Sequence, residues 1–287
     1  MRQSLILTLC LGSAFGLSAC NKGPSKADVE RAIKDVNVID ESNLNEVMLT
    51  VADPNEGVLY FQKTLKENPD RLDIKRDLAL ALIRAKRPDE AAKAWAAVVQ
   101  DPESTLDDRV DLADALIRSG KWDEAEKVLN SVPPTHETFK RYRLEAMIAD
   151  TKKQWDKADS FYETAVGLTT TPAGTYNNWG YSKLTRGDYK GAERLFVQAL
   201  SYDPKLFTAK NNLVMARGAQ RQYQMPVIQM SQEERAQLLY TMALIAIKQN
   251  DVNIGKGLLQ EAIDTHPRHF EAAVQALRAL QSQVSNG

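Results

Sequence analysis

The apolar positions of this chain fall into short helical segments that recur with a fixed period. Small residues mark one phase of the pattern, and a bulky apolar side chain follows each of them four residues later, on the same face of a helix. The small residues are Ala91, Ala125, Ala158 and Ala192, at spacings of 34, 33 and 34 residues, and the bulky ones are Trp95, Leu129, Tyr162 and Phe196. A period of this length predicts an array of helical repeats.

A second row of small residues lies twelve residues before the first and consists of Ala79, Ala113, Ala146 and Gly180. Each repeat therefore contains two predicted helices. One hairpin cannot bury its apolar face, whereas stacked hairpins bury a continuous core and expose a long concave surface. The pattern resembles the tetratricopeptide repeat (TPR). This resemblance implies an all-α fold: a right-handed α-solenoid of TPR helix hairpins with a C-terminal capping helix.

The first twenty residues are typical of an export signal. Met1 and Arg2 form a basic start, and the mainly apolar run at 5–17 is too short for a membrane span. The tetrad Leu-Ser-Ala-Cys at 17–20 resembles the bacterial lipoprotein box, which implies cleavage before Cys20 and lipidation of Cys20. The alternative is an ordinary cleaved signal with a chance cysteine. Asn21 follows, where that family associates aspartate with inner-membrane retention, so the resemblance implies a lipid anchor in the outer membrane, facing the periplasm.

The predicted segments follow from where the repeat pattern starts, weakens and stops. They are a lipoprotein signal peptide (1–19), a lipidated N-terminus and spacer (20–35), a degenerate first TPR (36–71), four TPR units (72–205), a degenerate repeat with an irregular insert (206–235), a TPR (236–267), and a capping helix and tail (268–287). The last helix is alternatively a surface for self-association, which would make the protein a homo-oligomer.

The composition argues against nucleic-acid binding and against disulfides in the exported protein. The 37 basic and 38 acidic residues leave no positive surplus, which argues against nucleic acid as a partner. The chain has two cysteines, Cys10 and Cys20, and cleavage before Cys20 would leave no free thiol and no disulfide in the exported protein.

No recognisable catalytic constellation is present in the sequence, so we expect no catalytic residue, metal or cofactor. His266 and His269 lie close together at a helix start, but a third ligand is missing and a solvated turn is the simpler interpretation. The segment 255–257 (Gly-Lys-Gly) is too short for a phosphate-binding loop and falls at a repeat contact point.

The TPR resemblance implies a protein-binding groove lined by the first helix of each hairpin. The alternative is that Leu80, Ile117 and Leu184 pack on neighbouring hairpins and contact no partner. The positions that match the family pattern are Arg76, Leu80, Ile83, Arg84, Val110, Asp114, Ile117, Arg118, Arg143, Met147, Asp150, Asn177, Tyr181, Leu184, Asn211, Met215, Tyr240 and Leu244. This mixed surface favours an amphipathic helix or an extended segment over a highly charged tail.

Two further features leave alternatives open. The pairs Asn177–Asn178 and Asn211–Asn212 lie 34 residues apart. They either fix helix packing or bind a peptide carboxylate, although the lysines of family carboxylate clamps are replaced here by Asn177 and Asn211. The segment 220–230 is apolar and contains Pro226, which breaks helices. It is either tucked over a gap in the stack or offered to a partner.

The lipoprotein box, the weak first unit and the C-terminal stretch together resemble a narrower family. The stretch includes Tyr-Asn-Asn-Trp-Gly at 176–180, Lys-Asn-Asn-Leu at 210–213 and the segment 266–271. The family is TadD, the TPR lipoproteins of tight-adherence (Flp) pilus systems. The resemblance implies a non-enzymatic lipoprotein that binds a pilus secretin or assembly subunit and assists its targeting or assembly. The alternative is an adaptor for outer-membrane protein insertion or cell-wall hydrolases. A cell-wall enzyme carrying repeats is the competing class, but no unassigned stretch is large enough for a catalytic fold.

Overall fold

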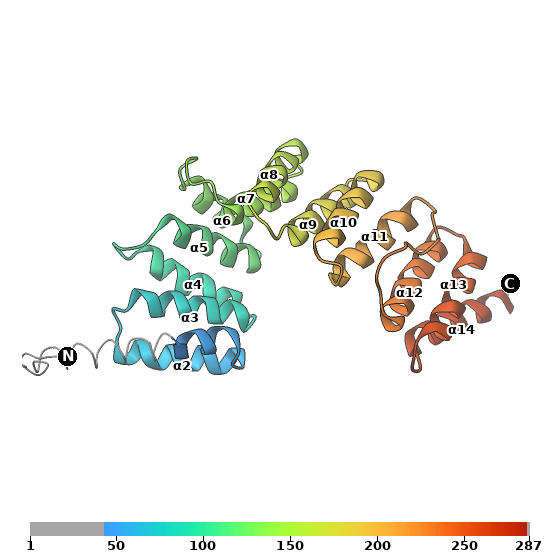
Figure 1. The fold of residues 1–287 in the computed structure, drawn as a ribbon, viewed down its shortest axis with the longest axis horizontal. Helices are drawn as coiled ribbons and strands as arrows, with labels where there is room; N and C mark the ends of the chain where they lie inside the picture. Colours follow the sequence, from blue (N-terminus) through green and yellow to red (C-terminus); the bar gives the residue numbers. More distant parts are fainter. Residues whose placement is uncertain (1–42, 286–287) are drawn as a thin grey trace, which may run out of the picture.

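The computed structural model describes residues 43–285, which form helices without any strand. The signal peptide, Cys20 and the spacer therefore lie outside the described residues. The helices stack into an arch (Figure 1), with the N-terminal hairpins at one foot and the C-terminal ones at the other. The all-α prediction is confirmed as an α-solenoid of helix hairpins. None of the helices described here is both long and apolar enough to cross a membrane.

Residues 43–50 are helical and precede the labelled elements. These are α2 (Pro54–Glu67), α3 (Leu72–Arg84), α4 (Pro88–Val99), α5 (Leu106–Arg118), α6 (Trp122–Asn130), α7 (Phe139–Thr151), α8 (Trp155–Gly167), α9 (Ala173–Thr185), α10 (Tyr189–Tyr202), α11 (Phe207–Ala219), α12 (Gln232–Lys248), α13 (Val252–Thr265) and α14 (Glu271–Ser285). The hairpins are α3/α4, α5/α6, α7/α8, α9/α10 and α12/α13, and α14 packs on α13.

The rows of small residues mark the helix contacts, as predicted. All four alanines of the main row are fully buried, and so are Ala79, Ala113 and Ala146 of the second row. Gly180 shows the reason most directly: a Cβ added there would lie 2.6 Å from a ring carbon of Phe196, which is fully buried in the same hairpin. The small residue lets α9 and α10 approach, and the large one fills the space between them.

Each first helix ends in the same tight turn. The residue after the helix cap has a positive φ: Lys86, Gly120, Lys153, Gly187, Arg221 and Asn250, at 56–84°. The next amide donates back to the helix, as in the 2.9 Å bond from Arg87 N to Leu82 O. This is the Schellman cap, and it reverses the chain within a few residues. Its recurrence after α11 shows that this helix ends like a first helix, although no second helix follows.

The chain between α11 and α12, residues 220–231, runs without helix and packs over the place of the missing second helix. Tyr223, Met225 and Met230 pack against the apolar cluster of α12–α14, and Ile228 packs against that of α10 and α11. Tyr223 Oη also donates to Gln249 Oε1 at 2.7 Å. Of the two predicted alternatives, the tucked arrangement describes most of this segment, while Val227 is fully exposed.

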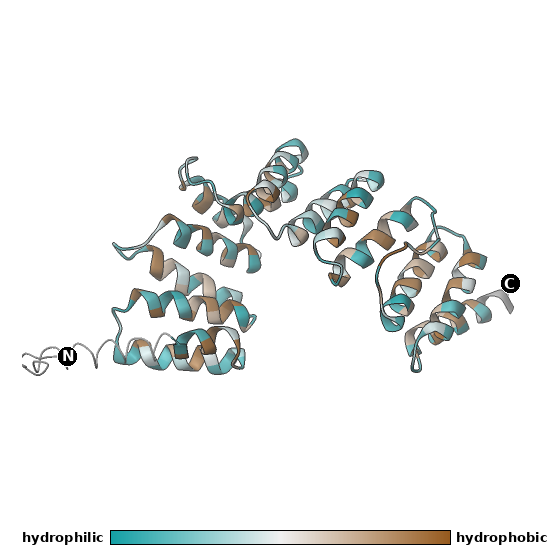
Figure 2. Ribbon diagram, in the orientation of Figure 1, coloured by the Kyte–Doolittle hydropathy of each residue, from teal (hydrophilic) through white to brown (hydrophobic). Residues whose placement is uncertain are grey.

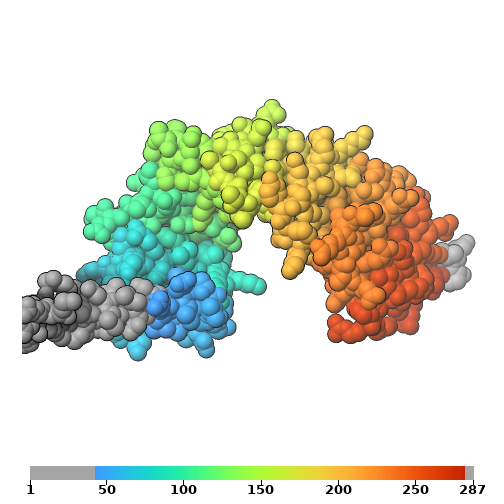
Figure 3. Space-filling model, in the orientation of Figure 1, coloured from blue at the N-terminus to red at the C-terminus, as the bar shows by residue number. Residues whose placement is uncertain are grey.

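The buried apolar side chains form four clusters in series. The first lies between residues 58 and 148, the second between 146 and 162, the third between 192 and 216, and the fourth between 214 and 273. Hydrophobic and hydrophilic residues alternate within the helices (Figure 2), as expected for elements that bury one stripe each. Helix contacts join neighbours in the stack, so one face of the arch stays open (Figure 3).

Candidate functional site: a pocket on the concave face

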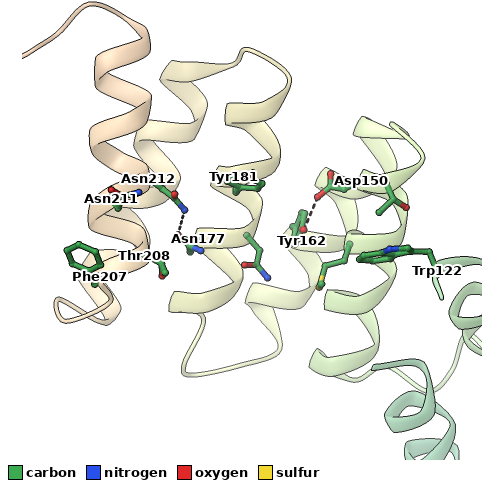
Figure 4. Close-up of a pocket in the computed structure, with 12 residues that line it drawn as sticks. Trp122, Asp150, Tyr162, Asn177, Tyr181, Phe207, Thr208, Asn211 and Asn212 are labelled. Carbon is green, nitrogen blue, oxygen red and sulfur yellow. Dashed lines mark hydrogen bonds between the residues drawn. The ribbon is translucent and has the colours of Figure 1, made fainter. Parts of the chain in front are cut away.

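The first helices of successive hairpins contact one another, α5 with α7, α7 with α9 and α9 with α11. A pocket of about 550 Å³ opens across α7, α9 and α11 (Figure 4). Its lining residues are Trp122, Met147, Asp150, Thr151, Tyr162, Asn177, Asn178, Tyr181, Phe207, Thr208, Asn211 and Asn212. The volume falls in the range of small-ligand and side-chain pockets.

The floor of the pocket carries one charged group, Asp150, which is held by neighbouring hydroxyls. Tyr162 Oη donates to Asp150 Oδ2 at 2.8 Å, and Ser182 Oγ donates to Asp150 Oδ1 at 2.6 Å. Burial raises the pKa of Asp150 above its ordinary value, against the opposing effect of these two hydrogen bonds. Burial and the nearby carboxylate of Asp150 also raise the pKa of Tyr162, so its hydroxyl stays protonated and keeps donating.

Asparagines form one wall, because the 34-residue period places equivalent residues of α9 and α11 side by side. Asn212 Nδ2 donates to Asn177 Oδ1 at 3.0 Å, which ties the two helices together. Asn211 Oδ1 accepts from Thr241 Oγ1 of α12 at 2.9 Å. Asn178 makes no side-chain hydrogen bond to any residue in 43–285. The packing interpretation of the pairs therefore holds for three amides, and Asn178 keeps its donors and acceptor for a ligand.

Aromatic side chains give the pocket its apolar surface. Figure 4 shows Trp122 at one end, Phe207 at the other and Tyr181 between them on α9. Tyr181 is 51% exposed, the largest exposure among the aromatic rings of the pocket. Rings that stand open at a concave surface are the usual anchors of protein interfaces, because they bury much area at a small entropic cost.

The structure brings together five of the eighteen residues that match the family's groove pattern: Met147, Asp150, Asn177, Tyr181 and Asn211. The pocket residues that were not predicted as groove residues are Trp122, Thr151, Tyr162, Asn178, Phe207, Thr208 and Asn212. Asn178 and Asn212 belong to the asparagine pairs, so the repeat period was a usable signal for them. Phe207 and Thr208 occupy the first turn of α11, from which no groove residue was predicted.

The other thirteen predicted groove residues do not line this pocket. Val110 is 1% exposed in the first apolar cluster, so its assignment to an open groove is corrected: it packs the hairpin core. Ile117, at 6%, is buried as its packing alternative stated, while Leu80 is 41% exposed.

Several of the charged groove residues are engaged within the protein. Asp114 is 8% exposed and accepts from Arg118 Nε at 3.0 Å. Arg76 forms a two-bond pair with Asp108, at 2.8 Å each. Arg84 donates to Met48 O at 3.3 Å, and Arg143 lies 3.9 Å from Asp114. Arg76 and Asp114 are therefore paired with opposite charges within the protein, and Arg84 is held by a main-chain oxygen.

Met215 and Tyr240 are engaged farther along the stack. Met215 Sδ accepts from Asn211 Nδ2 at 3.6 Å, and Tyr240 packs on Phe270 with ring centroids 5.4 Å apart.

The paired histidines take part in local contacts at a turn. His266 Nδ1 lies 2.8 Å from Arg268 O, and His269 Nε2 lies 2.6 Å from Glu271 Oε2. Within residues 43–285, no group of three or more histidine, cysteine or acidic side chains is placed to hold a metal ion.

Comparisons with known proteins agree with this architecture. Residues 49–105 match the tetratricopeptide repeat family model. No curated protein sequence matches the chain. Three solved structures of related fold share 11–17% of residues with it, and likeness at that level shows the fold alone.

The first of these structures is the APC/C hetero-tetramer Cut9–Hcn1. It is 13% identical, covers 82% of this chain with a TM-score of 0.59, and this chain spans 48% of its length. A thermophilic TPR protein of Thermus thermophilus is 17% identical over 61% of this chain and 95% of its own, with a TM-score of 0.53. A tetratricopeptide repeat protein from Parabacteroides merdae is 11% identical over 88% of this chain and 98% of its own, also at 0.53.

Proposed function

We propose that this TPR-type solenoid is a non-enzymatic scaffold that holds a segment of a partner protein in its concave pocket. The observation that carries the proposal is the apolar, nearly uncharged surface presented by α7, α9 and α11 together. Asp150 is the one charged lining residue, and both of its oxygens accept hydrogen bonds from within the protein. A site without a free cation favours a neutral segment over an acidic tail or a terminal carboxylate.

The polar groups of the pocket suit a peptide backbone. Asn178 offers both a donor and an acceptor, and Asn212 has its side-chain oxygen left over after it donates to Asn177. An exposed peptide backbone presents N–H donors and C=O acceptors. One side-chain amide can therefore accept from the N–H groups and donate to the C=O groups. Apolar side chains of the same segment would then pack between Tyr181 and Phe207.

We further propose that the scaffold is an outer-membrane lipoprotein that assists targeting or assembly of a secretin in a tight-adherence (Flp) pilus apparatus. The lipoprotein box that ends at Cys20 and the C-terminal stretch that resembles the TadD family support this finer proposal. An adaptor for outer-membrane protein insertion or for cell-wall hydrolases is the alternative, because a lipid anchor and an uncharged groove would serve it equally.

Site-specific photocrosslinking tests both levels of the proposal. A photoreactive residue replaces Tyr181 in the pocket of the full-length protein in its native membranes, and another replaces Tyr189 of α10, which is 37% exposed and does not line the pocket. We expect the probe at 181 to capture a pilus secretin or assembly subunit, and the probe at 189 to capture none.

The other outcomes separate the proposals. Capture of insertion factors or murein hydrolases at 181 would replace the pilus proposal with the adaptor. Crosslinks only between copies of this chain, or equal capture at both positions, would reject the pocket as a binding site. A Tyr181→Ala variant with an unchanged melting temperature should lose capture by a probe placed at Thr208, whereas Tyr189→Ala should keep it.

A further inference from the structure

A cleft runs along the outer side of α10, the second helix of the hairpin α9/α10. It consists of two hollows of about 690 and 260 Å³, and Val197 lines both of them. One wall is α10, from Lys190 in its first turn to Ser201 near its end, and the other is the irregular segment 220–231. No residue lines both this cleft and the pocket of α7, α9 and α11, so the two are separate sites, and Tyr189 lines neither.

The cleft has the length of a short helix. Residues 190, 194, 197 and 201 follow one another at one-turn spacing, so they form a stripe along α10. This stripe rises about 16 Å, or about three helical turns. The opposite wall, 220–231, stands where the array would have its next second helix. A helix of about three turns therefore fits along α10.

The cleft side of α10 departs from the other second helices at two positions. In α4, α6 and α8, the exposed residues at the position of Lys190 are Asp89, Asp123 and Asp156, and those at the position of Val197 are Ala96, Asn130 and Glu163. The helix dipole favours an acidic side chain in the first turn and disfavours a lysine there. A β-branched side chain that is 51% exposed, as Val197 is, loses rotamer freedom in a helix with little packing in return. Neither residue serves the stability of α10, which indicates a contact surface.

The charge of the cleft is positive. Lys190 and Arg194 are exposed, and neither forms an ion pair or a side-chain hydrogen bond with any residue in 43–285. The carboxylate of Glu193 in the same lining is already engaged, because it accepts from Arg217 Nη1 at 3.2 Å and from Gln220 Nε2 at 3.1 Å. The complement of this surface is an apolar side chain flanked by carboxylates.

We propose that this cleft binds an acidic amphipathic helix of a partner protein, laid along α10. Carboxylates one turn apart on that helix pair with Lys190 and Arg194, and an apolar side chain one turn farther packs on Val197. An anionic lipid surface would match the charge, but it has no element that enters a cleft between two walls. The scaffold can then hold this helix while its concave pocket is occupied.

Photocrosslinking from Val197 tests the proposal in the full-length protein in its native membranes. Mass spectrometry of the crosslinked peptide identifies the captured segment, and we expect one segment of one protein, with acidic residues one turn apart. Lys190→Glu combined with Arg194→Glu should lower capture about tenfold, because two attractions become repulsions. Replacing the acidic residues of the captured segment by lysine should restore capture by this double variant.

Two controls separate lost binding from damage to the fold. Lys93 of α4 is exposed at the position that Arg194 has in α10, so Lys93→Glu should leave capture unchanged. Lys190→Glu gives α10 the acidic first turn of the other second helices, so the melting temperature of the double variant should not fall.

The remaining outcomes would overturn the proposal. These are no capture from position 197, capture that is insensitive to the charge reversal, and a captured segment without acidic residues. Crosslinks only to lipid would replace the proposal with a membrane contact, and crosslinks only between copies of this chain would replace it with an oligomer surface.

Discussion

Replacing Gly180 by alanine is the sharpest test of how the hairpins pack. In α9 the added Cβ would lie 2.6, 2.8 and 3.1 Å from three ring carbons of Phe196. Real Cβ contacts are almost never this close, so the ring or the helix has to move. Phe196 is fully buried in the third apolar cluster, which leaves little room for the ring to turn away.

Two opposing contributions set the expected size of the effect. Alanine stabilises a helix interior by about 1 kcal/mol relative to glycine. Overpacking a filled core costs about 1–3 kcal/mol. Gly180→Ala should therefore be neutral to about 2 kcal/mol less stable than the natural protein. The matched control is Gly257→Ala in α13, where an added Cβ meets nothing within 4 Å, and it should gain about 1 kcal/mol.

Urea unfolding followed by helical circular dichroism measures both variants. Hydrogen exchange within α9 and α10 accompanies it, because repeat arrays do not always unfold in one step. Phe196→Leu should make Gly180→Ala less costly than it is with phenylalanine present, a coupling that a double-mutant cycle isolates. If Gly180→Ala is as stabilising as Gly257→Ala, the close contact does not limit the packing of this hairpin.

Three other substitutions test separate features. Burial and the neighbouring Asp73 raise the pKa of Asp77 from 3.8 to about 6, so the folded state holds the proton more tightly and loses stability as pH rises between these values. Asp77→Asn should therefore raise the melting temperature at pH 7, and the gain should vanish below about pH 4; a gain equal at both pH values would contradict this. Lys210 is 2% exposed and donates to Glu234 at 2.9 and 3.0 Å. Glu234→Ala leaves that ammonium buried without its partner and should cost about 3 kcal/mol in urea unfolding, against a small change for the exposed Glu233→Ala. Cys20→Ser should move the protein from the membrane to the soluble fraction on cell fractionation and remove any acyl mass; persistence in the membrane would reject the lipid anchor.

The fold was accessible from sequence because its determinants are local and repeated. Ala91 and Phe196 lie at positions whose size alone decides whether two helices can meet, and a 34-residue period repeats that decision along the chain. The turns were harder to predict from the sequence. Lys86, Lys153, Arg221 and Asn250 adopt positive φ without being glycine, because the Schellman hydrogen bonds compensate for the strain.

The pocket could be predicted from the sequence only in part, for a different reason. Met147 and Tyr181 follow from the family positions, but Trp122 of α6 and Phe207 of α11 join them through the placement of the hairpins along the arch. That placement sums small rotations between hairpins, and these depend on packing that single positions do not encode. Val110 shows the converse, since a predicted groove position is buried in the first apolar cluster.

The division of the apolar interior into four clusters has a mechanical consequence. A load applied between the two feet of the arch passes through packing units in series, and each unit can give way without its neighbours. Stretching should then proceed in several small steps, with reversible shortening when the load is removed. Such a stepwise response would be that of a compliant spring and not of a rigid rod.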